Sequence, residues 1–196
     1  MSDVTRREAM QILGGIPLLA AGLSPQAVGR ATLAARDALA TPAAFAPKFF
    51  TPHELATASL LADLVIPKDE RSGSATDAGV PQFMDFILDE NEGMRTAFRG
   101  GLAWLDAECR RRFGREFVDA ADTQRRQILD DIAWPAKARK ELSQGVAFFN
   151  RFRDLTASGF FSSRLGVEDL QYIGNQFVTE WQGCPTAALE KLGVRY

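Results

Sequence analysis

The chain offers few side chains that could act as nucleophiles, bases or soft metal ligands. Its 196 residues include one histidine, His53, and two cysteines, Cys109 and Cys184. An iron–sulfur cluster typically needs four thiolates, and zinc or di-iron sites on helices need paired histidines. Motifs for covalent haem, dinucleotides or nucleotide phosphates do not stand out either. We therefore expect no catalytic, cofactor-binding or metal-binding residue in this chain.

The remaining polar residues have simpler explanations than catalysis. His53 falls in the first turn of a predicted helix, without the nucleophile and orienting partner that a general base needs, so we expect a surface or loop-contacting side chain. Asp85 and Asp89 lie four residues apart, and paired carboxylates can do acid–base work, but a solvated acidic face explains them more simply. Four arginines between positions 110 and 115 either meet an acidic partner or form the wet side of a helix. The net charge of −2 and the lack of interleaved aromatic residues argue against nucleic acid.

The two cysteines differ in their surroundings. Cys109 belongs to an apolar helical stripe and is expected to be a buried, inert thiol. Cys184 lies between Gly183 and Pro185 at the start of a predicted short helix, where the helix dipole favours a thiolate. In an oxidising compartment we favour a disulfide between Cys184 and another chain, but an internal bridge to Cys109 and a reduced thiol both stay open.

Helical periodicity predicts an all-α protein. Thr51, Pro52 and Glu54 form a capping box with proline at the first helical position. Apolar residues at helical spacing predict the further elements. The expected helices span residues 52–66, 81–91, 94–113, 122–133, 142–158 and 185–192.

The C-terminal part of the chain lacks clear periodicity between residues 160 and 184. We expect a long extended segment there, and such segments often serve binding. Its large aromatic side chains are the candidate contacts with a partner. They are Phe160, Phe161, Tyr172 and Trp181.

The N-terminus has the composition of an export signal. Arg6 and Arg7 precede an apolar stretch over residues 12–23, which is shorter than the roughly 20 residues that cross a bilayer. A basic start and a short apolar run define an export peptide, and paired arginines mark the twin-arginine route, which carries folded proteins. The alternative is an ordinary amphipathic N-terminal helix. We expect export to the periplasm through the twin-arginine translocase.

The expected cleavage site divides the chain into two parts. Ala38-Leu39-Ala40 offers an A-x-A pattern, so residues 1–40 would be signal and linker and residues 41–196 a small, irregular helical domain. The alanine-rich stretch 31–46 is expected to be a mobile linker, with ordered structure from Phe49 onward. The mature part has 156 residues and a net charge of −3, enough for one domain with a real core.

Several local motifs together resemble one known family, the gluconate 2-dehydrogenase subunit 3 family. The tail is most similar to small subunits associated with sugar or glucoside 3-dehydrogenases. The motifs that carry the resemblance are Phe49-Phe50-Thr51-Pro52-His53-Glu54, Leu64-Val65-Ile66-Pro67-Lys68-Asp69, Ala75-Thr76-Asp77-Ala78-Gly79-Val80-Pro81-Gln82-Phe83-Met84-Asp85, Gly159-Phe160-Phe161-Ser162-Ser163, Gly166-Val167-Glu168-Asp169-Leu170, Gly174-Asn175 and Trp181-Gln182-Gly183-Cys184-Pro185.

The resemblance implies a non-catalytic small subunit of a periplasmic flavin-dependent dehydrogenase. In such complexes the large subunit, of the glucose–methanol–choline oxidoreductase type, holds FAD and oxidises a sugar or sugar acid, and a cytochrome c often takes the electrons. The large subunit often lacks an export signal and travels with the small one. A folded-route signal on a chain without a cofactor site agrees with this role of export escort and stabiliser. The rival classes are a stand-alone periplasmic enzyme and a binding module without a dehydrogenase partner.

Overall fold

The computed structural model describes residues 23–171, 179–180 and 183–194, and the regular structure in these residues is helical. The all-α prediction is therefore confirmed for the described part of the chain. None of the helices there is long and apolar enough to cross a membrane. The helices are α2 (Pro25–Ala40), α3 (Pro52–Val65), α4 (Val80–Glu90), α5 (Glu92–Phe113), α6 (Asp122–Ile132), α7 (Ser143–Ser162), α8 (Arg164–Asp169) and α9 (Thr186–Leu192), with short 3₁₀ turns η1 (Pro42–Ala44) and η2 (Lys140–Leu142).

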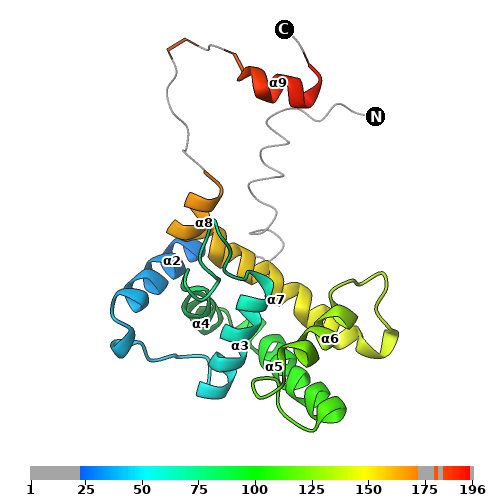
Figure 1. Ribbon diagram of the computed structural model, residues 1–196. Helices are drawn as coiled ribbons and strands as arrows, with labels where there is room; N and C mark the ends of the chain where they lie inside the picture. Colours follow the sequence, from blue (N-terminus) through cyan, green and yellow to red (C-terminus); the bar gives the residue numbers. More distant parts are fainter. Residues whose placement is uncertain (1–22, 172–178, 181–182, 195–196) are drawn as a thin grey trace.

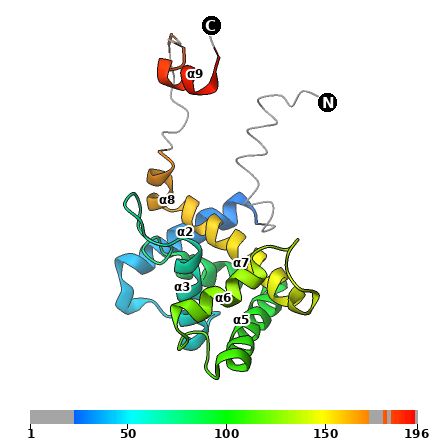
Figure 2. The ribbon, with the colours of Figure 1, turned by 45° about the vertical axis from the view of Figure 1, so that its right-hand side comes forward.

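The core lies around α4 and α7. Helix α4 contacts α2, α3, α5 and α7. Helix α7 contacts α2, α3, α4, α5, α6 and α8. Figure 1 shows α7 running through the middle of the molecule, with α8 at one of its ends and the loop after α6 near the other. Helix α9 lies apart from the packed helices in both views (Figures 1 and 2), and none of its residues is buried.

Helix α3 begins as the sequence predicts. The Thr51 hydroxyl accepts a hydrogen bond from the Glu54 backbone N–H at 3.2 Å, and the Glu54 carboxylate accepts one from the Thr51 N–H at 2.8 Å. Pro52 occupies the first helical position. The capping box therefore satisfies two N–H groups that have no partner within the helix.

Helix α2 occupies most of the stretch that we expected to be a mobile linker. Residues 25–40 form four turns of helix, capped by the Ser24 hydroxyl, which accepts a hydrogen bond from the Ala27 N–H at 3.2 Å. Val28, Ala31 and Ala35 are buried against the rest of the domain. Small alanine side chains suit this position because they let two helices approach closely while adding no strain to the helix. The prediction that ordered structure begins at Phe49 is wrong.

The first part of the segment that we expected to be extended, residues 160–169, is helical instead. Helix α7 runs through Gly159 to Ser162, and Ser163 caps α8 by accepting a hydrogen bond from the Gly166 N–H at 3.1 Å. Gly159 lies inside the helix and packs against α4, where a Cβ on Gly159 would be 2.8 Å from the ring of Phe83. Residues 160–169 are therefore almost entirely helical, and residues 172–178 and 181–182 lie outside the described part.

Helices α5 and α7 interlock through two glycines and two aromatic rings. A Cβ on Gly101 of α5 would lie 1.9 Å from the ring of Phe148, and a Cβ on Gly145 of α7 would lie 2.2 Å from the ring of Trp104. Each helix thus offers a glycine and, three residues later, an aromatic side chain that fills the hollow on its neighbour. This arrangement sets the closest approach of the two longest helices in the described residues.

A substitution at this contact tests the interlock. Gly101→Ala should lower the free energy of unfolding by about 3 kcal/mol, because the Phe148 ring has no room to accept a methyl group. The matched control is Gly100→Ala on the same helix, where nothing lies within 4 Å of the added Cβ. The control should raise stability by about 0.5–1 kcal/mol through helix propensity. Urea denaturation of both variants measures the difference, and equal effects would contradict the interlock.

Candidate functional site

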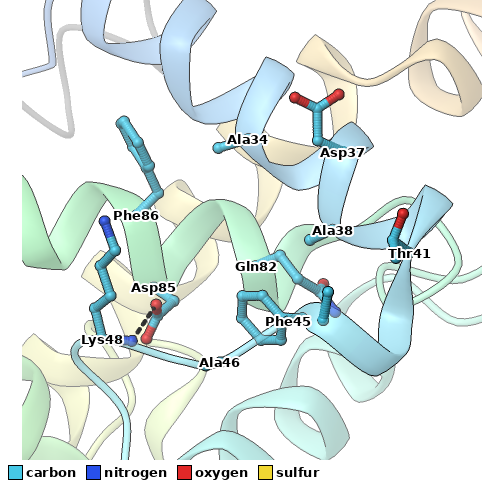
Figure 3. A pocket seen from close by; sticks show the side chains of 11 residues that line it. Ala34, Asp37, Ala38, Thr41, Phe45, Ala46, Lys48, Gln82, Asp85 and Phe86 are labelled. Carbon is cyan, nitrogen blue, oxygen red and sulfur yellow. Dashed lines mark hydrogen bonds between the residues drawn. The ribbon is translucent and has the colours of Figure 1, made fainter.

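Helix α2 is bordered by a cleft on each side, and together they form the candidate site. Residues at spacing i, i+3, i+4 and i+7 of a helix share one face. One such set, Ala34, Asp37, Ala38 and Thr41, faces a cleft toward α4, which we call the α4 cleft (Figure 3). A second set, Thr32, Ala35, Arg36 and Leu39, faces a cleft toward α7 and α8, which we call the α8 cleft.

The α4 cleft has a volume of about 340 Å³. Figure 3 shows Gln82, Asp85 and Phe86 of α4 on one side and the segment with Phe45 and Lys48 closing its lower edge. The Oε1 atom of Gln82 is buried and has no hydrogen-bond partner among the described residues. A buried amide oxygen in this state is open to a donor from a water or a bound group.

Asp85 anchors the chain that enters α3. Its carboxylate is buried and accepts hydrogen bonds from the backbone N–H groups of Lys48, Phe49 and Phe50 at 2.8, 3.0 and 2.9 Å. Arg99 of α5 completes this contact, since it donates to the Phe49 carbonyl at 2.7 Å and lies 4.7 Å from the centre of the Phe49 ring. The expected solvated acidic face is therefore wrong for Asp85, which has a structural role.

The α8 cleft has a volume of about 360 Å³ and an apolar floor. Phe83, Ala35 and Leu165 contribute to the floor, and the charged residues at the cleft are Arg36, Asp77 and Arg164. Ligand pockets and protein-docking hollows both combine an apolar lining with a few polar groups, so the cleft is a candidate for either kind of binding.

Exposed apolar side chains gather at the two ends of the described chain. Six of the seven large hydrophobic side chains that are exposed in the described residues lie on α2 or beyond residue 160, and the seventh is Trp134. The outermost on α2 is Leu33, which is 53% exposed and lies opposite the buried stripe of that helix. The six are Leu33, Leu39, Phe161, Leu170, Leu192 and Val194.

The aromatic residues proposed as partner contacts have different surroundings. Phe160 is only 1% exposed and lies in the core, so it is not available to a partner. Its neighbour Phe161 is 40% exposed, and the two rings meet edge to face with centres 5.2 Å apart. Tyr172 and Trp181 lie outside the described residues, as do the signal residues 6 and 7.

His53 has carboxylate partners that the sequence does not reveal. Its Nε2 atom lies 2.6 Å from Asp106 Oδ2 on α5, and its Nδ1 atom lies 3.7 Å from Glu116 Oε2. The hydrogen bond with Asp106 raises the pKa of His53 above its usual 6.5, with smaller contributions from the Asp106, Glu116 and Asp119 charges, while burial acts in the opposite direction. The cluster joins α3 to α5 and to the loop after it, which fits a structural contact.

The basic patch between positions 110 and 115 is largely paired within the chain. Arg111 and Arg112 both bind the Glu108 carboxylate, and hydrogen bonds from these guanidinium groups lower the pKa of Glu108 to about 2. Arg112 also binds Asp131 on α6 at 2.6 Å, and Arg110 binds Glu116 at 2.6 Å. This intramolecular pairing favours the solvated-helix interpretation over an acidic partner.

The two cysteines lie in contrasting environments, as expected. Cys109 is fully buried in α5 and forms no disulfide, and burial raises the pKa of its thiol. Cys184 is exposed, just before α9. A disulfide between Cys184 and another chain stays a prediction. Within the described residues, no group of three or more histidine, cysteine, aspartate or glutamate side chains is arranged to hold a metal ion.

Comparison with known proteins gives one match. The sequence model of the gluconate 2-dehydrogenase subunit 3 family matches residues 52–182, which is more than half of the chain. The chain belongs to the gluconate 2-dehydrogenase subunit 3 family. No curated protein and no solved structure matches it. The match begins at α3, so helix α2 and the two clefts beside it involve residues outside the segment that defines the family.

Helix α2 and the two clefts beside it were not predicted from the sequence. The two stripes, 34–37–38–41 and 32–35–36–39, follow helical spacing, but each mixes small, polar and charged residues, so neither is a clear apolar face. The serine cap at Ser24 followed by Pro25 is the signal that could have identified this helix.

The histidine contact can be measured directly because the chain has a single histidine. We expect the His53 imidazole signals in a proton NMR titration to report a pKa above 6.5. Asp106→Asn should return that pKa toward 6.5, because the amide keeps an oxygen for the Phe117 N–H, which donates to Asp106 at 3.0 Å, but loses the charge.

The same shift has a consequence for stability. A raised folded-state pKa means that the contact stabilises the protein fully below pH 6.5 and that this contribution is lost as pH rises through the raised value. The wild type should show this loss and Asp106→Asn should show much less of it. An unshifted wild-type titration would contradict the contact.

Proposed function

We propose that the chain is the non-catalytic small subunit of a periplasmic flavin-dependent sugar or glucoside dehydrogenase. In this proposal it escorts the FAD-bearing large subunit, of the glucose–methanol–choline oxidoreductase type, through the twin-arginine translocase and stabilises it afterwards. A cytochrome c would accept the electrons. The observation that carries the proposal is the family match over residues 52–182, since that family is named as a subunit of a dehydrogenase.

The distribution of reactive groups supports a partner-binding role. The single histidine is engaged by Asp106, the buried carboxylate of Asp85 binds backbone N–H groups, and Cys109 is buried. These three groups thus contribute to the fold of the described residues. A subunit whose partner holds the flavin and the substrate needs no more than this.

The exposed apolar side chains supply a surface for that partner. Obligate interfaces are large and apolar, and aromatic residues are enriched in them. We place the large subunit against the outer face of α2, the α8 cleft and the end of α8, where Leu33, Leu39, Phe161 and Leu170 are exposed. From the sequence alone, Tyr172 and Trp181 remain proposed contacts with the large subunit.

Replacing the paired arginines tests the escort role. Arg6→Lys together with Arg7→Lys should leave the flavoprotein in the cytoplasm, because the translocase reads the arginine pair. The matched control replaces Arg151 and Arg153 by lysine, which makes the same chemical change at exposed positions of α7, outside the proposed docking surface. Dehydrogenase activity in periplasmic and cytoplasmic fractions measures the result, and undiminished periplasmic activity in the first variant would refute the escort role.

Single charged substitutions test the docking surface. Leu33→Glu and Leu170→Glu should each weaken co-purification of the large subunit, by about tenfold or more in affinity, because each would bury an unpaired carboxylate at the interface. Trp134→Glu is the control, since Trp134 is 65% exposed and belongs to the loop after α6, which lies at the opposite end of α7 from α8 (Figure 1). Loss of binding in the control alone would place the interface elsewhere.

A further inference from the structure

We infer that α2 remains part of the exported subunit. Any cleavage of the signal peptide then occurs at or before the Gly22–Leu23 bond and not after Ala40. The statement about processing rests on the export proposed above, whereas the statement about α2 rests on the structure alone. The A-x-A pattern at Ala38-Leu39-Ala40, which predicts a cut after Ala40, would remove α2 entirely.

The burial of α2 is the first argument. Ala31 is 0% exposed, Ala35 is 4% and Val28 is 6%, and the helix contacts both α4 and α7. A cut after Ala40 would remove these side chains from the core and expose the apolar surfaces of α4 and α7 that they cover. For a domain of this size, losing the cover of one helix is a large fraction of the total stability.

Both ends of α2 are also attached to the domain. Leu23, just before the helix, is only 8% exposed, and Arg30 binds Glu90 at the end of α4 at 2.7 Å. At the other end, the Leu39 side chain packs on Gly79, where a Cβ would lie 3.0 Å from Leu39 Cδ1. Gly79 has a φ of 78°, a conformation that favours glycine, and this bare backbone makes room for Leu39.

The order of events during export makes the location of the cut important. On the twin-arginine route the chain is folded before a peptidase meets it, so the cut must fall in backbone that the folded domain leaves accessible. Ala38 to Ala40 form the last turn of a packed helix, and proteolysis favours exposed loops and termini over such helices. The small residues Ala20-Ala21-Gly22 lie just before Leu23 and offer an alternative small-residue site.

Processing is tested with Ala40→Asp in the full chain. Aspartate at this position would abolish cleavage after residue 40, because the peptidase requires a small residue there. We expect the exported wild type to begin at or before Leu23 and Ala40→Asp to begin at the same residue, as measured by intact mass of the periplasmic protein. An exported wild type that begins at Thr41, with the substitution blocking this cut, would overturn the inference.

The helix itself is tested in a way that does not depend on export. In purified full-length protein, Ala31→Asp should lower the thermal midpoint by about 10 °C, because it places an unpaired charge in the core. Ala40→Asp makes the same change at an exposed position of the same helix and should lower it by about 2 °C or less.

A milder variant covers the case in which Ala31→Asp does not fold. Val28→Ala removes two buried methyl groups and should lower the midpoint by about 5 °C. Midpoints of Ala31→Asp and Val28→Ala equal to that of Ala40→Asp would overturn the inference. A wild type that stays in the cytoplasm with Met1 intact would instead refute the proposed export, and the melting comparison would still decide whether α2 belongs to the domain.

Discussion

The burial of α4 is the constraint on which the rest of the structure depends. Seven of its eleven residues are buried, and they point in more than one direction around the helix. A helix that is apolar on several sides must be covered on several sides. Helices α2, α3 and α7 provide that cover. Helix α2 is therefore as much a part of the core as the helices within the family match.

Helix α4 also carries Asp85, the buried carboxylate that fixes how the chain enters α3. Burying a carboxylate is costly unless hydrogen bonds satisfy it, and Asp85 has three backbone N–H donors from residues 48–50. This anchor holds the segment after α2 against α4, and the capping box at Thr51 then starts α3. The α4 cleft between α2 and α4 is a consequence of this path, since the segment 41–48 closes its edge.

The functional proposal follows from where polar and apolar groups have been placed. Two of the polar side chains that the structure describes join helices, since His53 joins α3 to α5 and Arg112 joins α5 to Asp131 of α6. The exposed apolar side chains instead lie on α2 and beyond residue 160. A subunit of a dehydrogenase with this distribution is suited to holding a partner, and the partner would contribute the flavin and the substrate site.

The sequence by itself determined the helical class, the capping box at Thr51, the buried state of Cys109 and the family, because periodicity, caps and local motifs are short-range properties. Only the tertiary structure decided three other features. The alanine-rich stretch became helix α2, since its burial depends on the partly covered α4. Helix α7 continues through Gly159, where the absence of a side chain leaves room for the Phe83 ring of α4. Asp85 became an internal anchor because N–H groups 35 to 37 residues away in sequence converge on it. The burial of α2, the contact of Gly159 with Phe83 and the anchoring by Asp85 each depend on residues that are distant in sequence.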